Sequence, residues 1–115
     1  MASRLVIIGA GGFGREVLDI VDAINAQRPS YEFLGFLDDG DVRTDLLARL
    51  EAAHLGSSAS LAGLEASYVI GIGNGAVRRA LAATAPAGRA VNLVHPAATI
   101  GRDARLGVGV IIAAG

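Results

Sequence analysis

Four glycines within six residues are the feature of this sequence that points most directly to chemistry. The stretch Gly9-Ala-Gly-Gly-Phe-Gly14 fits the pattern G-x-G-x-x-G, which forms a phosphate-binding turn when it joins a strand to a helix. Glycine lets the backbone turn sharply and approach a ligand closely, while free amides at a helix amino terminus attract an anion. We therefore expect this turn to bind a phosphate or pyrophosphate group. The alternative is that the glycines serve only a tight turn and close helix packing.

Two further groups of residues stand where they could contact the same ligand. Asp38 and Asp39 follow a predicted strand, at the edge where open α/β sheets bind ligands, and a carboxylate there can accept hydrogen bonds from a ribose or a base. Gly73 and Asn74 belong to a second glycine-rich turn after another predicted strand. For both groups a purely structural role in a turn remains open.

Three arginines and one histidine are weaker candidates. Arg15, Arg78 and Arg79 lie in the first turns of predicted helices, where the helix dipole disfavours cations unless an anion compensates them. Their positions are consistent with contact to a bound phosphate, or equally with exposure to solvent at the protein surface. His95, next to Pro96, has no carboxylate partner at an indicative spacing, so we expect a structural role for it. The sequence shows no Ser-His-Asp set or cluster of metal ligands, and we predict no metal site.

The elements that must position these residues alternate along the chain. The hydrophobic pattern predicts strands over 4–9, 32–37, 68–72 and 90–94, helices over 12–27, 41–54 and 76–84, and a loop over 56–60. The first strand, the first helix and the second strand form a βαβ unit, whose two strands should be parallel. The expected fold class is therefore α/β with a parallel sheet.

The end of the chain follows a six-residue spacing. Aliphatic residues recur at every sixth position, at Ile100, Leu106 and Ile112. This spacing is typical of a left-handed parallel β-helix, in which three short strands form one triangular coil and each aliphatic side chain points inward. Such a solenoid buries its core only by stacking coils. We therefore expect a first domain over 1–95 and the truncated start of a β-helix over 96–115.

Composition argues against several classes of protein. The chain has 115 residues, a formal net charge of -1, sixteen glycines and no cysteine. A charge near zero argues against sequence-independent binding to nucleic acid, and the lack of cysteine excludes disulfides and thiolate metal sites. The apolar run 5–10 is too short for a transmembrane helix. We expect a cytoplasmic protein that contacts neither nucleic acid nor membrane.

Four motifs in a fixed order give this chain a family likeness. They are G-A-G-G-F-G-R-E after the first strand, F-L-D-D after the second, I-G-I-G-N-G-A-V-R-R after the third, and V-N-L-V-H-P-A-A-T-I-G before the hexapeptides. In these motifs the chain resembles the sugar acyltransferase family that contains sialic acid O-acetyltransferases and bacillosamine-pathway N-acetyltransferases. The resemblance covers essentially the whole chain.

The resemblance implies a small Rossmann-like domain that binds a nucleotide sugar, commonly UDP-linked, followed by a left-handed β-helix. It implies that the full-length protein forms homotrimers and binds acetyl-CoA between subunits. An amino or hydroxyl group of the sugar would attack the thioester, while a β-helix histidine paired with a carboxylate takes the proton. That histidine would lie beyond Gly115, so this chain is expected to bind substrate without acetylating it.

The same resemblance assigns the substrate contacts residue by residue. The residues that we expect at the nucleotide sugar are Gly11, Gly12, Phe13, Gly14, Arg15, Asp38, Asp39, Gly73 and Asn74. Phe13 stands where several relatives have histidine, so a ligand contact from that side chain is lost or altered here.

Two other functions fit part of the sequence. An NAD(P)-binding oxidoreductase domain would also use the glycine-rich turn and an acidic residue such as Asp38 on the ribose, but it does not explain the six-residue spacing. A nucleotide-sensing module would bind the ligand and leave the full-length protein without acyltransferase activity. The identity of the sugar, the acyl group and the acceptor atom stay open.

Overall fold

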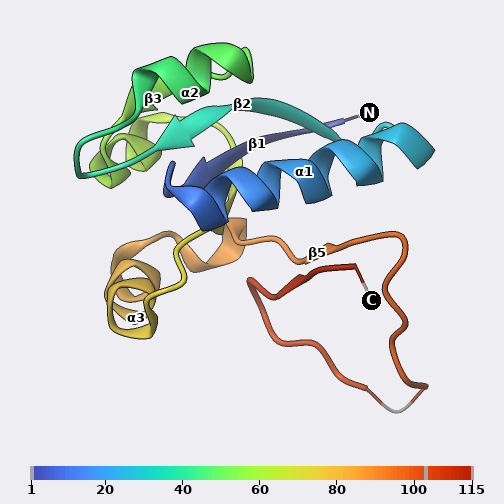
Figure 1. Cartoon of the computed structure of the whole chain (residues 1–115). Helices are drawn as coiled ribbons and strands as arrows, with labels where there is room; N and C mark the ends of the chain where they lie inside the picture. The colour runs from blue at the N-terminus through green and yellow to red at the C-terminus, as the bar shows by residue number, and fades with distance from the viewer. Residues whose placement is uncertain (1, 103, 115) are drawn as a thin grey trace.

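A computed structural model describes residues 2–102 and 104–114 and shows an α/β architecture (Figure 1). The elements, in chain order, are β1 (Ser3–Ile8), α1 (Gly12–Gln27), β2 (Tyr31–Leu37), α2 (Thr44–Arg49), β3 (His54–Gly56), the 3-10 helix η1 (Ser58–Gly63), β4 (Ser67–Ile70), α3 (Gly75–Thr84), the 3-10 helix η2 (Ala87–Arg89), β5 (Leu93–Val94) and β6 (Ile111–Ile112). Four strands form a parallel sheet in the order β3-β2-β1-β4, and β5 pairs with β6. The predicted fold class and the parallel β1-α1-β2 unit are confirmed.

The central strand β1 is buried on both faces of the sheet. Leu5, Val6 and Ile7 have no exposed surface and Ile8 retains 2%. Leu5 and Ile7 pack in the core on the α1 side, while Val6 and Ile8 pack in the core on the other side. A parallel strand that is covered on both faces needs such a continuous apolar run.

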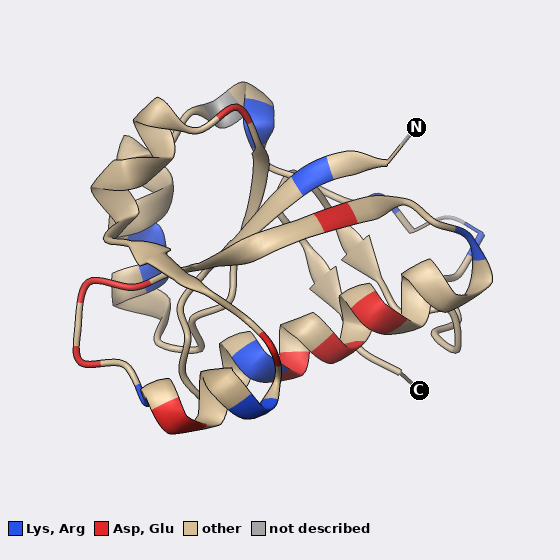
Figure 2. Ribbon diagram, turned by 90° about the horizontal axis from the view of Figure 1, so that it is seen from above, with Lys and Arg blue, Asp and Glu red and all other residues tan. Residues whose placement is uncertain are grey.

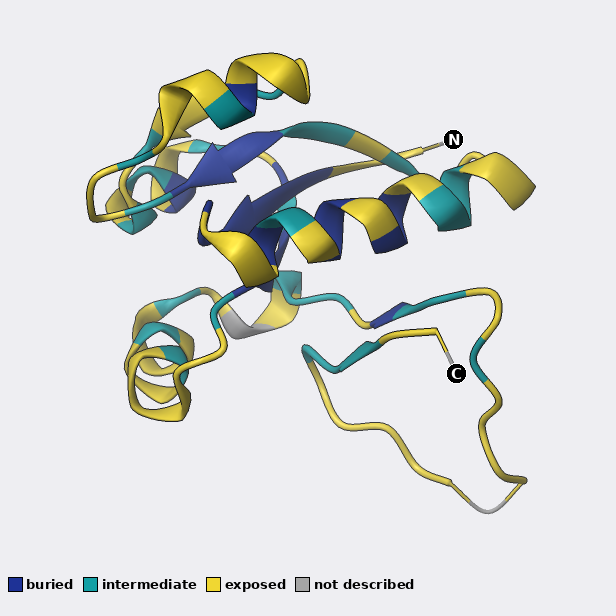
Figure 3. Ribbon diagram, viewed as in Figure 1, coloured by how far each residue is buried: buried dark blue, intermediate teal, exposed yellow. Residues whose placement is uncertain are grey.

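Different helices cover the two faces of this sheet. On one face, Val17 and Val21 of α1 and Leu47 of α2 join the core. On the other face lie Leu61 of η1 and the partly buried Leu81 of α3. No residue of α3 is buried, and Figure 3 shows this helix as largely exposed. Within the described ranges, no helix combines the length and the apolar character of a membrane span.

Strand β2 contains a bulge at a glycine. The register with β1 pairs Leu5 with Phe33 and then Val6 with Gly35, which leaves one extra residue in β2. Gly35 has a φ of +151°, and a Cβ there would lie 2.7 Å from the carbonyl oxygen of Ala53. Glycine at this position therefore allows the chain that enters β3 to approach β2 closely.

The predicted helix over 41–54 is wrong at both ends. Helix α2 covers only its middle, and His54 already belongs to β3. The segment 56–60, predicted as a loop, contains the end of β3 and the start of η1. The apolar stripe that suggested a longer helix continues to Leu50, which is 43% exposed, so hydrophobic spacing alone does not show where this helix ends.

A hydrogen-bonded turn ends α2. Glu51 takes a left-handed φ of +54°. The amide of Ala52 donates to the oxygen of Leu47 at 2.9 Å, and the amide of Glu51 donates to the oxygen of Ala48 at 3.1 Å. This pair of bonds is a Schellman motif, in which glycine is the usual residue at the left-handed position.

The predicted strand over 90–94 is wrong as a single element. Ala90 makes one parallel bridge to Tyr68 of the edge strand β4, and the chain then leaves the sheet. Strand β5 pairs in parallel with β6 instead, with Leu93 opposite Ile111. The backbone groups of β5 thus find their partners in a segment that follows much later in the chain.

A wide loop returns the chain from β5 to β6, drawn in orange and red in Figure 1. The amide of Leu93 donates to the oxygen of Val110 at 2.8 Å. The Asn92 side chain donates to the oxygen of Gly107 at 2.8 Å and accepts from the amide of Val110, eighteen residues away, at 2.7 Å. The returning segment therefore lies eighteen residues after its partner, three times the six-residue spacing of the sequence.

The aliphatic side chains of this loop remain largely exposed. The exposed fractions are 40% for Ile100, 41% for Leu106 and 76% for Val108. Leu93, at the other side of the pairing, is fully buried in the core beneath α1. The loop is thus fixed to the domain at its two ends and not by its aliphatic residues.

We predict that Glu51→Gly stabilises the protein by about 1 kcal/mol, since a side chain in the left-handed region costs about that much. Urea denaturation followed by circular dichroism measures the difference. Ala48→Gly is the matched control, because it places glycine inside the same helix and should destabilise by about 1 kcal/mol. A loss of stability in Glu51→Gly would contradict the assigned helix end.

Candidate functional site

Three glycines allow α1 to pack directly on the ends of two strands. A Cβ on Gly9, which has a φ of +108°, would lie 2.6 Å from Cγ1 of Ile72. A Cβ on Gly14 would lie 1.8 Å from the oxygen of Gly9, and one on Gly71 would lie 2.9 Å from Cα of Gly14. Because no larger residue fits, these glycines are required by the fold, whatever the function.

Three other glycines of the same region are not required by packing. A Cβ on Gly11 or Gly73 would meet no atom within 4 Å, and one on Gly12 would meet only Nη2 of Arg15 at 4.0 Å. The φ of Gly11 is -80°, which any residue can adopt. The missing side chains at these positions leave the backbone accessible to an external group. Packing therefore explains Gly9 and Gly14 of the motif but not Gly11 and Gly12.

The amino terminus of α1 is uncapped. Gly11 is its N-cap residue and offers no side chain to the first amides, and the first turn contains no acidic residue. The Arg15 amide donates to the oxygen of Gly11 at 3.0 Å. Phe13, in the same turn, is 38% exposed. Amides at such a helix end, together with the helix dipole, attract an anion.

Asp38 connects the end of β2 to the glycine-rich turn. Its Oδ2 accepts from the amide of Ala10 at 2.8 Å, and its Oδ1 accepts from the amide of Gly40 at 2.8 Å. The structure therefore brings this carboxylate and the turn together. This is expected, because the carboxyl ends of adjacent parallel strands lie at the same edge of the sheet. Each carboxylate oxygen has a second lone pair, so acceptor capacity remains for a ligand.

Asp39 fixes the start of η1. It accepts from the amide of Ser58 at 2.6 Å and from the Ser58 hydroxyl at 2.8 Å. Ser58 belongs to no sequence motif, because one serine in a short polar stretch carries no distinctive signal. These two bonds place the hydroxyl and the carboxylate side by side at the same edge of the sheet.

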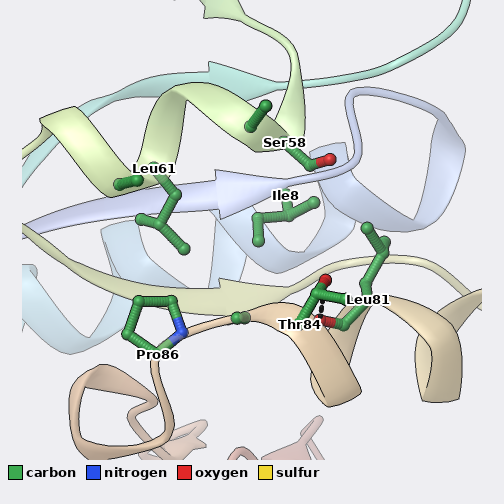
Figure 4. A pocket seen from close by; sticks show the side chains of 9 residues that line it. Ile8, Ser58, Leu61, Leu81, Thr84 and Pro86 are labelled. Atoms are coloured by element: carbon green, nitrogen blue, oxygen red, sulfur yellow. Dashed lines mark hydrogen bonds between the residues drawn. The ribbon is translucent and has the colours of Figure 1, made fainter.

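A cavity of about 300 Å³ adjoins Ser58 on the face of the sheet opposite α1. Figure 4 shows Ile8 between Leu61 of η1 and Thr84 of α3 in this cavity. Its walls are mainly apolar, and the Thr84 hydroxyl donates to the oxygen of Leu81 at 3.3 Å. The cavity has room for a small, mostly apolar group next to Ser58, which Asp39 binds.

Asn74 caps α3. Its Oδ1 accepts from the amides of Ala76 and Val77 at 3.0 and 3.1 Å, which satisfies two amides at the start of the helix. The side-chain oxygen is thus used inside the protein. Contacts to a ligand fall to its side-chain nitrogen or to the open backbone at Gly73.

Arg78 also has partners within the chain. Its guanidinium donates to the oxygen of Ile70 at 2.6 Å and to the oxygen of Gly109 at 2.7 Å. It therefore links the end of β4 to the segment that leads into β6. At least two of its nitrogens are committed to this link, which explains its place in the first turn of α3 without a phosphate.

His95 is held in the turn that follows β5. Its Nδ1 accepts from the amide of Ala97 at 2.9 Å, and its own amide donates to the oxygen of Ile112 at 2.8 Å. Both contacts are structural. In the part of the chain that the structure describes, no three histidine or carboxylate side chains gather as metal ligands.

Known proteins share both the sequence pattern and the fold. The family model described as the PglD N-terminal domain matches residues 4–85. The acetyltransferase domain of PglB from Neisseria gonorrhoeae FA1090, solved in complex with acetyl coenzyme A, is 29% identical with a TM-score of 0.78, over 99% of this chain and 54% of that chain. A second structure of that domain is 28% identical with a TM-score of 0.76, over 97% and 54%. This chain thus spans about half the length of those structures. No curated protein matches it.

Gly14→Ala should destabilise the protein by about 3 kcal/mol or more, because the added Cβ overlaps backbone that has no room to move. Gly12→Ala is the matched control in the same turn and should change stability by less than about 0.5 kcal/mol. Urea denaturation of both variants measures the difference. Equal stability of the two variants would show that the packing requirement is misassigned.

Asp38→Asn should destabilise the protein by about 1 to 2 kcal/mol without any ligand, because an amide presents one acceptor where the carboxylate serves two amides. The exposed change Asp41→Asn is the control and should stay within about 0.5 kcal/mol of the original chain. Thermal denaturation of the three proteins is the measurement. A variant as stable as the control would mean that Asp38 does not hold the turn.

Proposed function

The chain belongs to the family of PglD N-terminal domains, and from this premise we propose that it binds a UDP-linked sugar as the substrate domain of an acetyl-CoA-dependent sugar acetyltransferase. The observation that carries the proposal is the uncapped start of α1 beside the open backbone of Gly11 and Gly12. A diphosphate is a natural ligand for such a helix end. The carboxylate of Asp38, next to this turn, supplies an acceptor for a ribose or a base.

Within this proposal, each group of residues at the carboxyl edge of the four-stranded sheet binds a different part of the nucleotide sugar. The backbone over 11–14 contacts the diphosphate, and Asp38 and Asp39 accept hydrogen bonds from the nucleoside. The apolar cavity beside Ser58 receives the base, which its position next to Asp39 supports. The remaining contacts fall to Phe13, Arg15, Gly73 and Asn74.

For the whole protein we propose transfer of an acetyl group from acetyl-CoA to an amino or hydroxyl group of the bound sugar. The acceptor atom attacks the thioester carbonyl, the bond to sulfur breaks, and the acceptor loses a proton to a base. The acetyl coenzyme A bound to the PglB domain supports this co-substrate. We do not assign the base to His95, because its Nδ1 accepts from the amide of Ala97, which places the proton of the neutral ring on Nε2.

We also propose that the first domain ends at His95 and that residues 96–115 begin a left-handed β-helix. The parallel pairing of β5 with β6, eighteen residues apart, supports this, since three hexapeptides make one coil. Stacked coils would cover Ile100 and Leu106, which are exposed here. The homotrimer of the full-length protein belongs to the same proposal.

Calorimetric titration of this chain with a UDP-N-acetylhexosamine, UDP, CMP-sialic acid and NAD tests the proposed ligand. We expect heat from the UDP-sugar and from UDP. Binding of NAD alone would overturn the proposal in favour of a redox or sensor domain. Binding of CMP-sialic acid alone would overturn the choice of nucleotide, and the absence of heat from all four would contradict ligand binding by this chain.

Gly12→Val should weaken binding of the UDP-sugar by about tenfold or more, because a branched side chain keeps the diphosphate from the helix amides. Stability should change little, since the nearest atom to a Cβ at Gly12 is Nη2 of Arg15, at 4.0 Å. Gly101→Val is the control: it adds the same bulk at an equally open glycine far along the chain and should leave affinity unaltered. Equal affinities in two folded variants would remove the glycine-rich turn from the binding site.

A further inference from the structure

A second, smaller pocket lies between α1 and the end of α2. Its volume is about 180 Å³, and it is lined by Arg15 and Asp19 of α1, by Leu46 and Arg49 of α2, and by Leu50 at the end of α2. In Figure 2 blue segments of the two helices lie next to each other. Two arginines of like charge therefore line one pocket.

Neither of these two arginines has an acidic partner among the described residues. The ion pair that the described structure contains joins Arg43 to Asp45 at 3.0 Å, at the start of α2. Arg15 donates through Nε to the oxygen of Gly11 at 3.3 Å, a bond that leaves its two Nη groups available. Asp19 lines the same pocket without forming an ion pair with either arginine.

The pocket lies beside the glycine-rich turn. Nη2 of Arg15 is 4.0 Å from the position that a Cβ of Gly12 would take. The positive end of the α1 dipole is at the same place, and the first turn has no acidic residue. Beyond this turn the exposed side of α1 is acidic, as Figure 2 shows in red, so positive charge is confined to the amino-terminal end.

We propose that Arg15 and Arg49 together bind a phosphate group in this pocket, so that α2 contributes a ligand contact which no motif of the sequence indicates. The inference rests on the proposed function and names a further contact of that site. Two guanidinium groups repel each other unless an anion lies between them, and each can form paired bonds to phosphate oxygens.

The size and the walls of the pocket suit a single charged group. Its volume of about 180 Å³ is below the roughly 300 Å³ from which sites for whole small molecules start. Leu46 and Leu50 supply the apolar part of the lining, and the two arginines supply the donors for charged hydrogen bonds to a phosphate. The phosphate belongs either to the diphosphate of the nucleotide sugar or to a free phosphate compound.

Asp19 limits the affinity of this pocket for a phosphate group. Its carboxylate lines the pocket and repels a phosphate group, so it lowers the affinity that the two arginines provide. Removal of this charge should therefore strengthen binding, and removal of the Arg49 charge should weaken it. Opposite effects from two residues of one pocket separate a direct contact from a general change in the fold.

Arg49→Gln and Asp19→Asn, titrated calorimetrically with UDP, inorganic pyrophosphate and inorganic phosphate, test the inference. The control is Arg43→Gln, which removes the same charge from the same segment. Arg43 is bonded to Asp45, and this bond holds the pKa of the Asp45 carboxyl below its ordinary value. We expect Arg49→Gln to weaken UDP and pyrophosphate binding about tenfold and Asp19→Asn to strengthen it about threefold, with Arg43→Gln within about twofold of the original chain.

The outcomes separate this inference from the proposed function. Unchanged UDP binding in Arg49→Gln, or equal losses in Arg49→Gln and Arg43→Gln, would overturn the inference and leave the nucleotide-sugar site standing. Pyrophosphate binding that depends on Arg49, in a chain that binds neither UDP nor UDP-sugar, would support the phosphate pocket and overturn the proposed function. Inorganic phosphate that binds as tightly as UDP, and depends on Arg49, would support the pocket and assign it to a free phosphate.

Discussion

The direct contact of α1 with the ends of β1 and β4 determines the rest of the candidate site. Gly9, Gly14 and Gly71 meet where no side chain fits, so the helix starts immediately above the carboxyl edge of the sheet. The position of the open amides, of Arg15 and of the Ala10 amide that Asp38 binds all follow from this contact. The site is therefore built mainly by packing, and its charged side chains are added to a backbone already fixed.

Sequence patterns predicted the elements that are marked by a continuous apolar run or by turn residues at both ends. Strand β1 is an uninterrupted apolar run, and α1 has an apolar face between a glycine turn and a proline, so type and bounds were predicted well. The end of α2 depends on a left-handed Glu51, a residue with no preference for that conformation. The strand predicted over 90–94 was divided because Leu93 finds its partner in Ile111, far along the chain. Periodicity within a short window does not contain such distant pairings.

For the candidate site, the sequence indicated which segments lie together but not the bonds that their side chains form. Strand order places the glycine-rich turn and Asp38 at one edge, as the sequence suggested, yet the internal bonds of Asp38 and Asp39 appear only in the folded chain. Glycine spacing also does not distinguish Gly14, which the core requires, from Gly12, which it does not. Arg49 belongs to no motif, and only the packing of α2 beside α1 brings it to Arg15.

The Arg78 guanidinium donates to the carbonyl oxygen of Ile70, in the four-stranded sheet, and to that of Gly109, in the segment that leads into β6. Together with Asn92, it holds the segment before β6 against the chain around β4 and β5 through side chains, in addition to the backbone pairing of β5 with β6. The returning segment is thus attached to the α/β fold by side-chain bonds as well as by backbone pairing. Changes within the loop that joins β5 to β6 should therefore leave this attachment in place, because the bonds that hold it lie at the two ends of the loop.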